Sequence, residues 1–258
     1  MLYAIVQKSL TPPSREQLVT AFRALPELTD YDAATMAKDA FGILVERLPM
    51  DKAGRLLQAL YAAGVEAEMV HHESLPALPA ASPIRRADIT DEAFVARDVL
   101  DRPDPVAWEN IILIAAGAVN LTEFKHTVTE KITYRPSSSH SAVPVIEYEH
   151  GDKAEDVARL RLDLFLSVEP GRYQIAAEKF SFDTLAPRPG SHTGSSFAAF
   201  VLACAARAPG ALLNRGALGL TKDSRRLVHY PGRHAFEEEC VWHLWRHYAS
   251  RSRDASPD

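Results

Sequence analysis

A proline-rich segment divides this chain into two parts with different hydrophobic patterns. Residues 74–83 read SLPALPAASP, with three prolines in ten positions and no hydrophobic periodicity. A segment of this composition is extended and fairly stiff. The 258 residues of the chain are enough for two ordinary domains. We therefore predict a first domain over residues 1–74, a linker over 75–91 and a second domain over 92–258.

The first part alternates between strand and helix patterns. Strand-like runs cover residues 2–7, 41–46 and 65–70. Ser14 and Gln17 fit a capping box at the start of a helix that ends at Pro26, and a second helix ends at Gly64. Residues 32–40 indicate a short helix or a turn. Each helix is apolar on one side, which predicts a small sheet with the helices on one face, a ferredoxin-like βαβαβ module. The stretch LLQALYAAGVEAEMV resembles the helix-glycine-strand unit of small bacterial regulatory domains of that shape.

The second part carries antiparallel strand signals at short spacing. The leucines at 160, 162, 164 and 166 alternate with Arg161, Asp163, Phe165 and Ser167, the cleanest strand pattern in the chain. Further strands are expected over 93–100, 106–119 and 173–177, with a turn over 101–105. Helices are expected over 195–206 and 236–250. Residues 120–158 are predominantly polar, and we predict that they form an insertion with a flexible tip, with a solvated turn at 153–156.

A resemblance to bacterial pleckstrin-homology-like (PH-like) domains follows from these runs. A strand and a proline-bearing turn lead into VAWENIILIAAGAV, which looks like the opening of such a domain. The runs LRLDLFLSV and RYQIAAEKFSF would supply paired strands, and residues 195–206 the closing helix. The resemblance implies a curved sheet or open barrel used for binding, and no enzyme. The expected fold class is α+β: a ferredoxin-like module, then a PH-like, mostly antiparallel β domain with C-terminal helices.

Charge and cysteine content argue against several protein classes. The formal charge is −5, which disfavours nucleic acid as a partner, although residues 205–258 are net +3. The two cysteines, Cys204 and Cys240, lie in apolar surroundings and are expected to be reduced core thiols rather than a disulfide framework. No signal peptide and no transmembrane segment are expected, and the apolar runs 111–119 and 197–206 are too short to span a bilayer. We expect a cytoplasmic protein without a cofactor.

Catalytic and metal motifs are weak. The sequence lacks the glycine-rich nucleotide-binding motifs, His-Glu-x-x-His and a calcium loop. Serines 137–139 and 141 flank His140, but Gly-x-Ser-x-Gly is absent, so a hydrophilic loop is the better interpretation. Cys240, His243 and His247 share one side of a predicted helix and form a zinc-competent set, with His229 or His234 as a possible fourth ligand.

Three hypotheses for function remain open. The first is a non-enzymatic binding or scaffold protein whose partner is another protein or its own copy. The second is an enzyme or small-molecule sensor with a cleft between the modules, and its candidate ligand-binding groups are Arg135, His140, Asp163 and Arg172. The third is binding to an anionic lipid or other anionic surface, for which the candidates are Arg207, Arg215, Arg225, Arg226 and Arg233.

Overall fold

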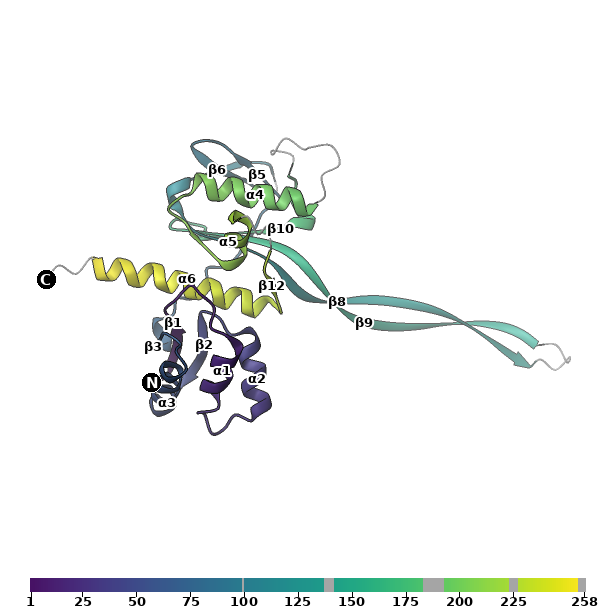
Figure 1. The fold of residues 1–258 in the computed structure, drawn as a ribbon. Coiled ribbons are helices and arrows are strands. Elements are labelled where there is room, and N and C mark those ends of the chain that lie inside the picture. The colour runs from purple at the N-terminus through teal and green to yellow at the C-terminus, as the bar shows by residue number, and fades with distance from the viewer. Residues whose placement is uncertain (99, 137–141, 183–192, 223–226, 255–258) are drawn as a thin grey trace.

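The protein is a mixed α+β structure built around three separate sheets in its described residues (Figure 1). The computed structural model describes residues 1–98, 100–136, 142–182, 193–222 and 227–254, and for much of the outer part of 120–158 it describes the backbone only. Among these residues, no helix combines the length and apolarity that crossing a membrane requires.

The first sheet has the order β2-β1-β3, and both outer strands run antiparallel to β1. The capping box predicted at Ser14 is present at the start of α1, and Thr29 with Asp32 forms another at α2. The helices pack on one face of the sheet around Ile5, Phe22 and other apolar side chains. The elements are β1 (Tyr3–Gln7), α1 (Arg15–Phe22), α2 (Asp30–Asp39), β2 (Ile43–Leu48), α3 (Met50–Ala62), β3 (Ala67–His71) and the single-turn η1 (His72–Ser74).

The second, central sheet follows the path β11-β8-β9-β10-β4, with β12 also paired to β8. The antiparallel pairing of β8 with β9 and of β9 with β10 dominates it, while the short strands β4, β11 and β12 pair in parallel. Its strands are β4 (Ser82–Pro83), β8 (Ile111–Pro136), β9 (Ala142–Leu166), β10 (Arg172–Ala176), β11 (Leu212–Leu213) and β12 (His229–Tyr230).

One face of the central sheet is covered by the third sheet and by two helices, with single-turn helices at η2 and η3. Even-numbered residues of β8 and β9, such as Ile114 and Leu162, enter this core together with Phe94 and Phe200. The elements are β5 (Arg86–Ile89), β6 (Ala93–Arg97), β7 (Pro103–Ala107), η2 (Trp108–Asn110), η3 (Ala177–Lys179), α4 (Thr193–Arg207) and α5 (Arg215–Thr221).

Helix α6 (Arg233–Asp254) fills the space between the other face of the central sheet and the N-terminal sheet (Figure 1). Phe236, Cys240 and Leu244 pack on the central sheet. Trp242 packs against Phe41, and its indole N–H donates to the Gln7 carbonyl at 2.9 Å. Gly42 permits this approach, because a Cβ there would lie 2.9 Å from the Trp242 ring. Both parts of the chain therefore share α6 as a common layer.

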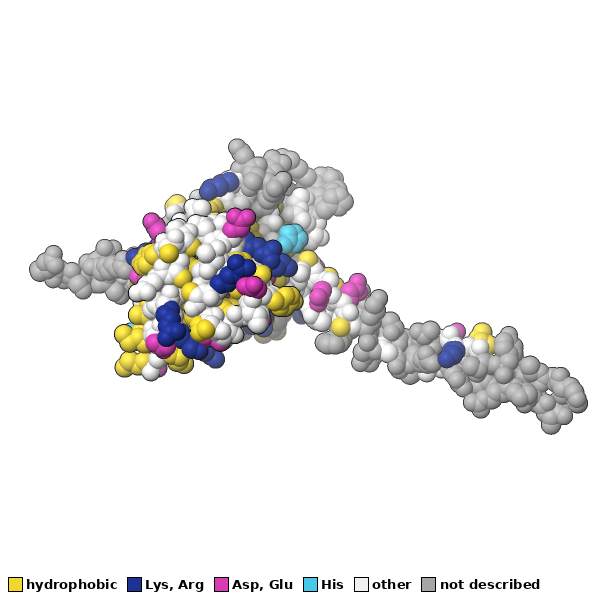
Figure 2. Space-filling model, turned by 60° about the horizontal axis from the view of Figure 1, so that its bottom comes forward, with side chains coloured by type: hydrophobic (Ala, Val, Ile, Leu, Met, Phe, Trp, Pro, Cys, Tyr) yellow, Lys and Arg dark blue, Asp and Glu magenta, His cyan; other side chains and the backbone are white. Residues whose placement is uncertain are grey.

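Several expectations are corrected by the strands. Residues 120–136 and 142–158, predicted as a polar insertion, continue β8 and β9 as a two-stranded ribbon that leaves the body (Figures 1 and 2), and residues 153–156 lie in β9 rather than in a turn. Polar residues are compatible with this because an uncovered ribbon has no core to fill.

Strand β7 begins at Pro103, inside the predicted turn. Within the predicted linker, residues 82–83 and 86–89 form β4 and β5. Helix α6 is longer than the predicted 236–250.

Candidate functional site

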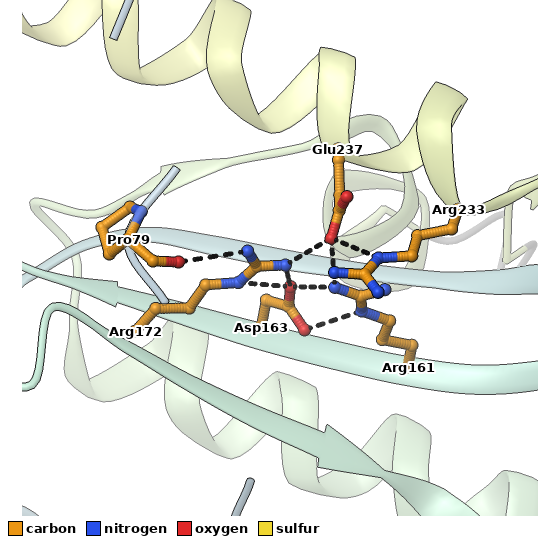
Figure 3. Close-up of polar contacts among 6 residues, drawn as sticks. All are labelled: Pro79, Arg161, Asp163, Arg172, Arg233 and Glu237. Atoms are coloured by element: carbon orange, nitrogen blue, oxygen red, sulfur yellow. Dashed lines mark hydrogen bonds and ion pairs between the residues drawn. The ribbon is translucent and has the colours of Figure 1, made fainter. Parts of the chain in front are cut away.

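A buried ionic network joins the central sheet to α6 (Figure 3). Asp163 has no exposed surface and accepts hydrogen bonds from Arg161 at 2.9 and 3.0 Å and from Arg172 at 2.6 and 2.9 Å. Glu237 of α6 accepts from both of these guanidinium groups at 3.0 Å and from Arg233 at 2.9 Å. Two of the predicted ligand-binding residues, Asp163 and Arg172, are thus brought together.

The network arises because odd-numbered residues of β9 face α6. Arg161 and Asp163 occupy positions that would otherwise hold apolar side chains, and Phe165 continues the same face into the core beneath α6. Arg172 lies opposite Phe165 on β10, so its guanidinium group reaches the same side. Arg172 also donates to the carbonyl of Pro79 at 3.4 Å, which fixes the proline-rich segment to the sheet.

The charges of this network compensate one another. Burial raises the pKa of Glu237, but hydrogen bonds from Arg172, Arg233 and Arg161 outweigh it and lower the pKa to about 2. Glu237 is therefore ionised at neutral pH, and both carboxyl groups are engaged by arginines of the protein itself. This arrangement links β9, β10 and α6, and it presents neither a free carboxylate nor a free base to a substrate.

Of the other two predicted ligand-binding residues, only Arg135 can be placed. His140 lies outside the described residues, and for Arg135 only the backbone is described, in β8 opposite Val143. Arg135 is about twenty residues along β8 from Ala115, the partner of Asp163, which corresponds to roughly 65 Å of extended strand. Arg135 therefore does not share a cleft with Asp163 and Arg172.

A second polar network lies beside the first. The Asn214 side chain has no exposed surface; it accepts from the backbone N–H of Ala116 and donates to the carbonyl of the same residue and to the Tyr230 hydroxyl, at 2.9–3.0 Å. Tyr230 donates to Glu239, which also accepts from Arg215. The guanidinium carbon of Arg215 lies 3.8 Å from the centre of the Phe41 ring, so this network connects α5 and α6 to the N-terminal part.

The predicted metal ligands are not gathered into a site. Among the described residues, no group of three or more His, Cys, Asp or Glu side chains is placed to hold a metal ion. Cys240 is buried in the core under α6, and burial raises the pKa of its thiol well above the usual value. The Nε2 atom of His243 lies 3.8 Å from Glu239, within the second network. Cys240, His243 and His247 were grouped because helical spacing puts them on one side of the helix. In the structure, Cys240 packs in an apolar core, whereas His243 lies beside Glu239.

The arginines proposed for an anionic surface are engaged within the protein where they are described. Arg207 contacts Asp91, Arg215 pairs with Glu239 and Arg233 pairs with Glu237. Residues 225 and 226 lie outside the described residues. The arginines at 207, 215 and 233 therefore serve three different intramolecular contacts.

The ribbon formed by the outer parts of β8 and β9, residues 121–136 and 142–157, is the most unusual feature of the molecule, and sequence reasoning missed it. From Leu113 to Pro136 the pairing with β9 has no register shift, so alternate residues lie on opposite faces throughout. We call the even-numbered positions 122–136 and 142–156 the apolar face, and the odd-numbered positions 121–135 and 143–157 the charged face.

The two faces differ in composition. Ten of the sixteen positions of the apolar face are apolar: Phe124, Val128, Ile132, Tyr134, Pro136, Ala142, Pro144, Ile146, Tyr148 and Ala154. Half of the charged face is ionic: Glu123, Lys125, Lys131, Arg135, Glu147, Glu149, Lys153 and Glu155. Where side chains of the apolar face are described, they are uncovered, since Ile132 is 57% exposed and Tyr148 is 56% exposed.

The apolar face continues into a cavity at the base of the ribbon. Even positions of β8 and β9 face α4 inside the body, and Ala118, Ala158 and Leu160 line a cavity of about 420 Å³ with Phe197 and Leu220. The apolar face therefore shares its side of the two strands with the core beneath α4, and the pairs Asn120–Ala158 and Thr122–Asp156 lie between them.

Comparison of this chain with protein-family models, with curated proteins and with solved structures finds no match. The function must therefore be argued from the geometry above.

Proposed function

We propose that this protein is a non-enzymatic binding or scaffold protein that contacts its partner through the ribbon of residues 121–136 and 142–157. The observation that carries the proposal is the one-sided apolar composition of that ribbon, together with the exposure of the described side chains of Ile132 and Tyr148. An isolated two-stranded hairpin is marginally stable in water, and an uncovered apolar strip is a mark of an interaction surface.

The body of the protein supports this proposal because it fixes the base of the ribbon. Strands β8 and β9 pass without interruption from the ribbon into the central sheet, where the two polar networks fix them to α5 and α6. A partner held by the ribbon is thus held at a defined position relative to the body. The closed ionic network favours this role over the enzyme hypothesis, because its carboxylates are already neutralised by arginines.

We propose in addition that the first part of the chain has a ferredoxin-like fold and the second part a PH-like fold. A ferredoxin-like first module is supported by β2, α3 and β3, which form a split βαβ unit around β1. A PH-like second module is supported by the antiparallel β8, β9 and β10 covered by α4. Folds of both kinds serve binding in many settings, so they are compatible with a scaffold and do not select a partner.

The proposal is tested with a photoreactive phenylalanine analogue introduced at position 132, on the apolar face, in cells that naturally produce the protein. Illumination is expected to give a discrete adduct, identified by mass spectrometry. The matched control places the same analogue at position 133, on the charged face, where the adduct should be at least ten-fold weaker. No adduct at position 132, or equal adducts at the two positions, would overturn the proposal.

A further inference from the structure

The structure points to a second copy of this chain as the partner of the apolar face, with the two ribbons packed face to face and antiparallel. This inference rests on the proposed function and names the partner. Three observations carry it: the area of the face, the pattern of residues along it, and the cavity at its base.

The area of the face is sufficient. The sixteen residues of β8 from Leu121 to Pro136 extend about 50 Å, and two paired strands with their side chains are about 10 Å wide. Covering this face removes on the order of 500 Å² from each copy, or about 1,000 Å² in total, which reaches the lower bound for a specific interface. The ribbon is twisted, so the two copies would coil about each other over this length (Figure 1).

The pattern along the face is self-complementary. Val128 lies at the middle of the ribbon on β8, so a two-fold axis through its level gives the greatest overlap of two antiparallel ribbons. Each position n of β8 then lies opposite position 256 − n of the other copy, by the geometry of the axis. Phe124 falls opposite Ile132, and Val128 falls opposite itself.

The charges of the face are compatible with the same register. The apolar face holds three acidic residues and no Lys or Arg. About the Val128 level, Glu130 lies opposite His126 of the second copy, while Asp152 lies opposite Tyr148 and Asp156 opposite Pro144. No carboxylate is placed opposite another, so this register avoids the repulsion that two acidic strips would otherwise produce.

The register also brings the far end of each ribbon to the base of the other. Pro136 and Ala142 lie opposite Asn120 and Ala158 of the second copy. Ala158 is part of the wall of the apolar cavity under α4, so the interface would run from one such cavity to the other. The charged face stays in water on the outside of both ribbons, which suits its equal numbers of acidic and basic residues.

The first test is sedimentation of the purified full chain over a concentration series. We expect a species of twice the chain mass of 28.5 kDa. The double substitution Ile132→Glu and Tyr148→Glu should weaken dimerisation at least ten-fold. The control, Thr129→Glu and Thr133→Glu, adds the same charge to the charged face and should leave the dissociation constant within about two-fold. Circular dichroism verifies that both variants keep the folded body.

The second test concerns the register. Val128→Cys should be linked between copies by a short bismaleimide, because this position lies opposite itself, whereas Thr127→Cys on the charged face should not. The native Cys204 and Cys240 are fully buried and do not compete for the reagent.

A monomer at all concentrations, or equal weakening by the two double substitutions, overturns the dimer. If the dimer is weakened only by the substitutions on the apolar face, but Val128→Cys is not cross-linked between copies, the antiparallel register is wrong. If the purified chain is monomeric while position 132 captures a different protein in cells, the second copy is wrong as the partner and the proposed function stands. If both experiments fail, the proposed function fails as well.

Discussion

Glu237 shows how single residues hold the layers of this molecule together. It comes from α6 and receives hydrogen bonds from Arg161 and Arg172 of the central sheet, while Arg233 of its own helix supplies another. Buried ion pairs add little net stability compared with apolar packing, but removing one partner leaves the others uncompensated. Changing Glu237 is therefore expected to destabilise the protein.

We predict that Glu237→Gln lowers the free energy of unfolding at pH 7 by about 2 kcal/mol, which corresponds to roughly 4–8 °C in Tm. The pKa of Glu237 is lowered in the folded state to about 2 from an ordinary value of 4.5. Its stabilising contribution is thus complete above pH 4.5 and is lost as the pH falls towards 2.

The check is thermal unfolding of the protein and the variant between pH 7 and 2. The difference in stability should be constant above pH 4.5 and shrink below it. Glu92→Gln, at an exposed position, serves as the control and should shift Tm by less than about 1 °C. A difference that does not change with pH would contradict the assigned role of Glu237.

At the scale of elements, α6 is the layer shared by the two parts of the chain. Its Trp242 has no exposed surface and fills the contact with Phe41 and Gly42. We predict that Trp242→Ala destabilises the protein by about 3–5 kcal/mol, because it leaves a large cavity and an unpaired Gln7 carbonyl.

Hydrogen exchange should locate this effect. Amides of β1 and β2 should lose protection at least ten-fold more than those of β9 and β10. Tyr248→Ala, on the same helix but 47% exposed, provides the comparison and should change neither region. Equal loss of protection in all four strands would contradict the prediction, because it would mean that Trp242 stabilises the central sheet as much as the N-terminal sheet.

Much of the element pattern could be predicted from the sequence, and the exceptions have a physical reason. The strand at Leu160–Leu166 and the helix after Ser14 were predicted from their periodicity, because leucines alternate along the strand and apolar residues recur at helical spacing after the capping box. Residues 120–158 were predicted as a polar insertion with a turn at 153–156, and the continuation of β8 and β9 through 120–136 and 142–158 was not predicted. Their β-branched content, including Thr127, Val128 and Thr129, was the available signal for extended strands.

The candidate site was predicted only in part. Asp163 and Arg172 were proposed as ligand-binding residues, and they lie together in the structure, where Arg172 pairs both with Asp163 and with Glu237, 65 positions further along the chain. Such a contact leaves no local pattern in the sequence. The same holds for the packing of Trp242 on Gly42, which follows from how the sheets are stacked rather than from either segment alone.

At the scale of the whole molecule, the ribbon and the body are separable. Asn120 and Ala158 are directly paired, so residues 121–157 can be replaced by an Asn-Gly turn without breaking the inner ladder. We predict that the excised protein keeps a Tm within about 5 °C of the parent, because the cores beneath α4 and α6 are formed by residues outside the excised segment.

The measurement is thermal unfolding together with sedimentation, in which the excised chain should be folded and monomeric. A chain that no longer folds would show that the ribbon contributes to the body, and a persistent dimer would place the contact between copies elsewhere.

The position of α6 in the sequence has a consequence for biosynthesis. During translation the N-terminal sheet emerges first, yet Trp242, Val241 and Trp245 of α6 supply a large part of the cover on the face that carries Val6, Phe41 and Ile43. Until the ribosome has released residues 233–254, that apolar face lacks the cover that α6 provides. The nascent chain is thus a natural client for a chaperone, and a premature stop codon ahead of α6 would yield a product open to aggregation and proteolysis.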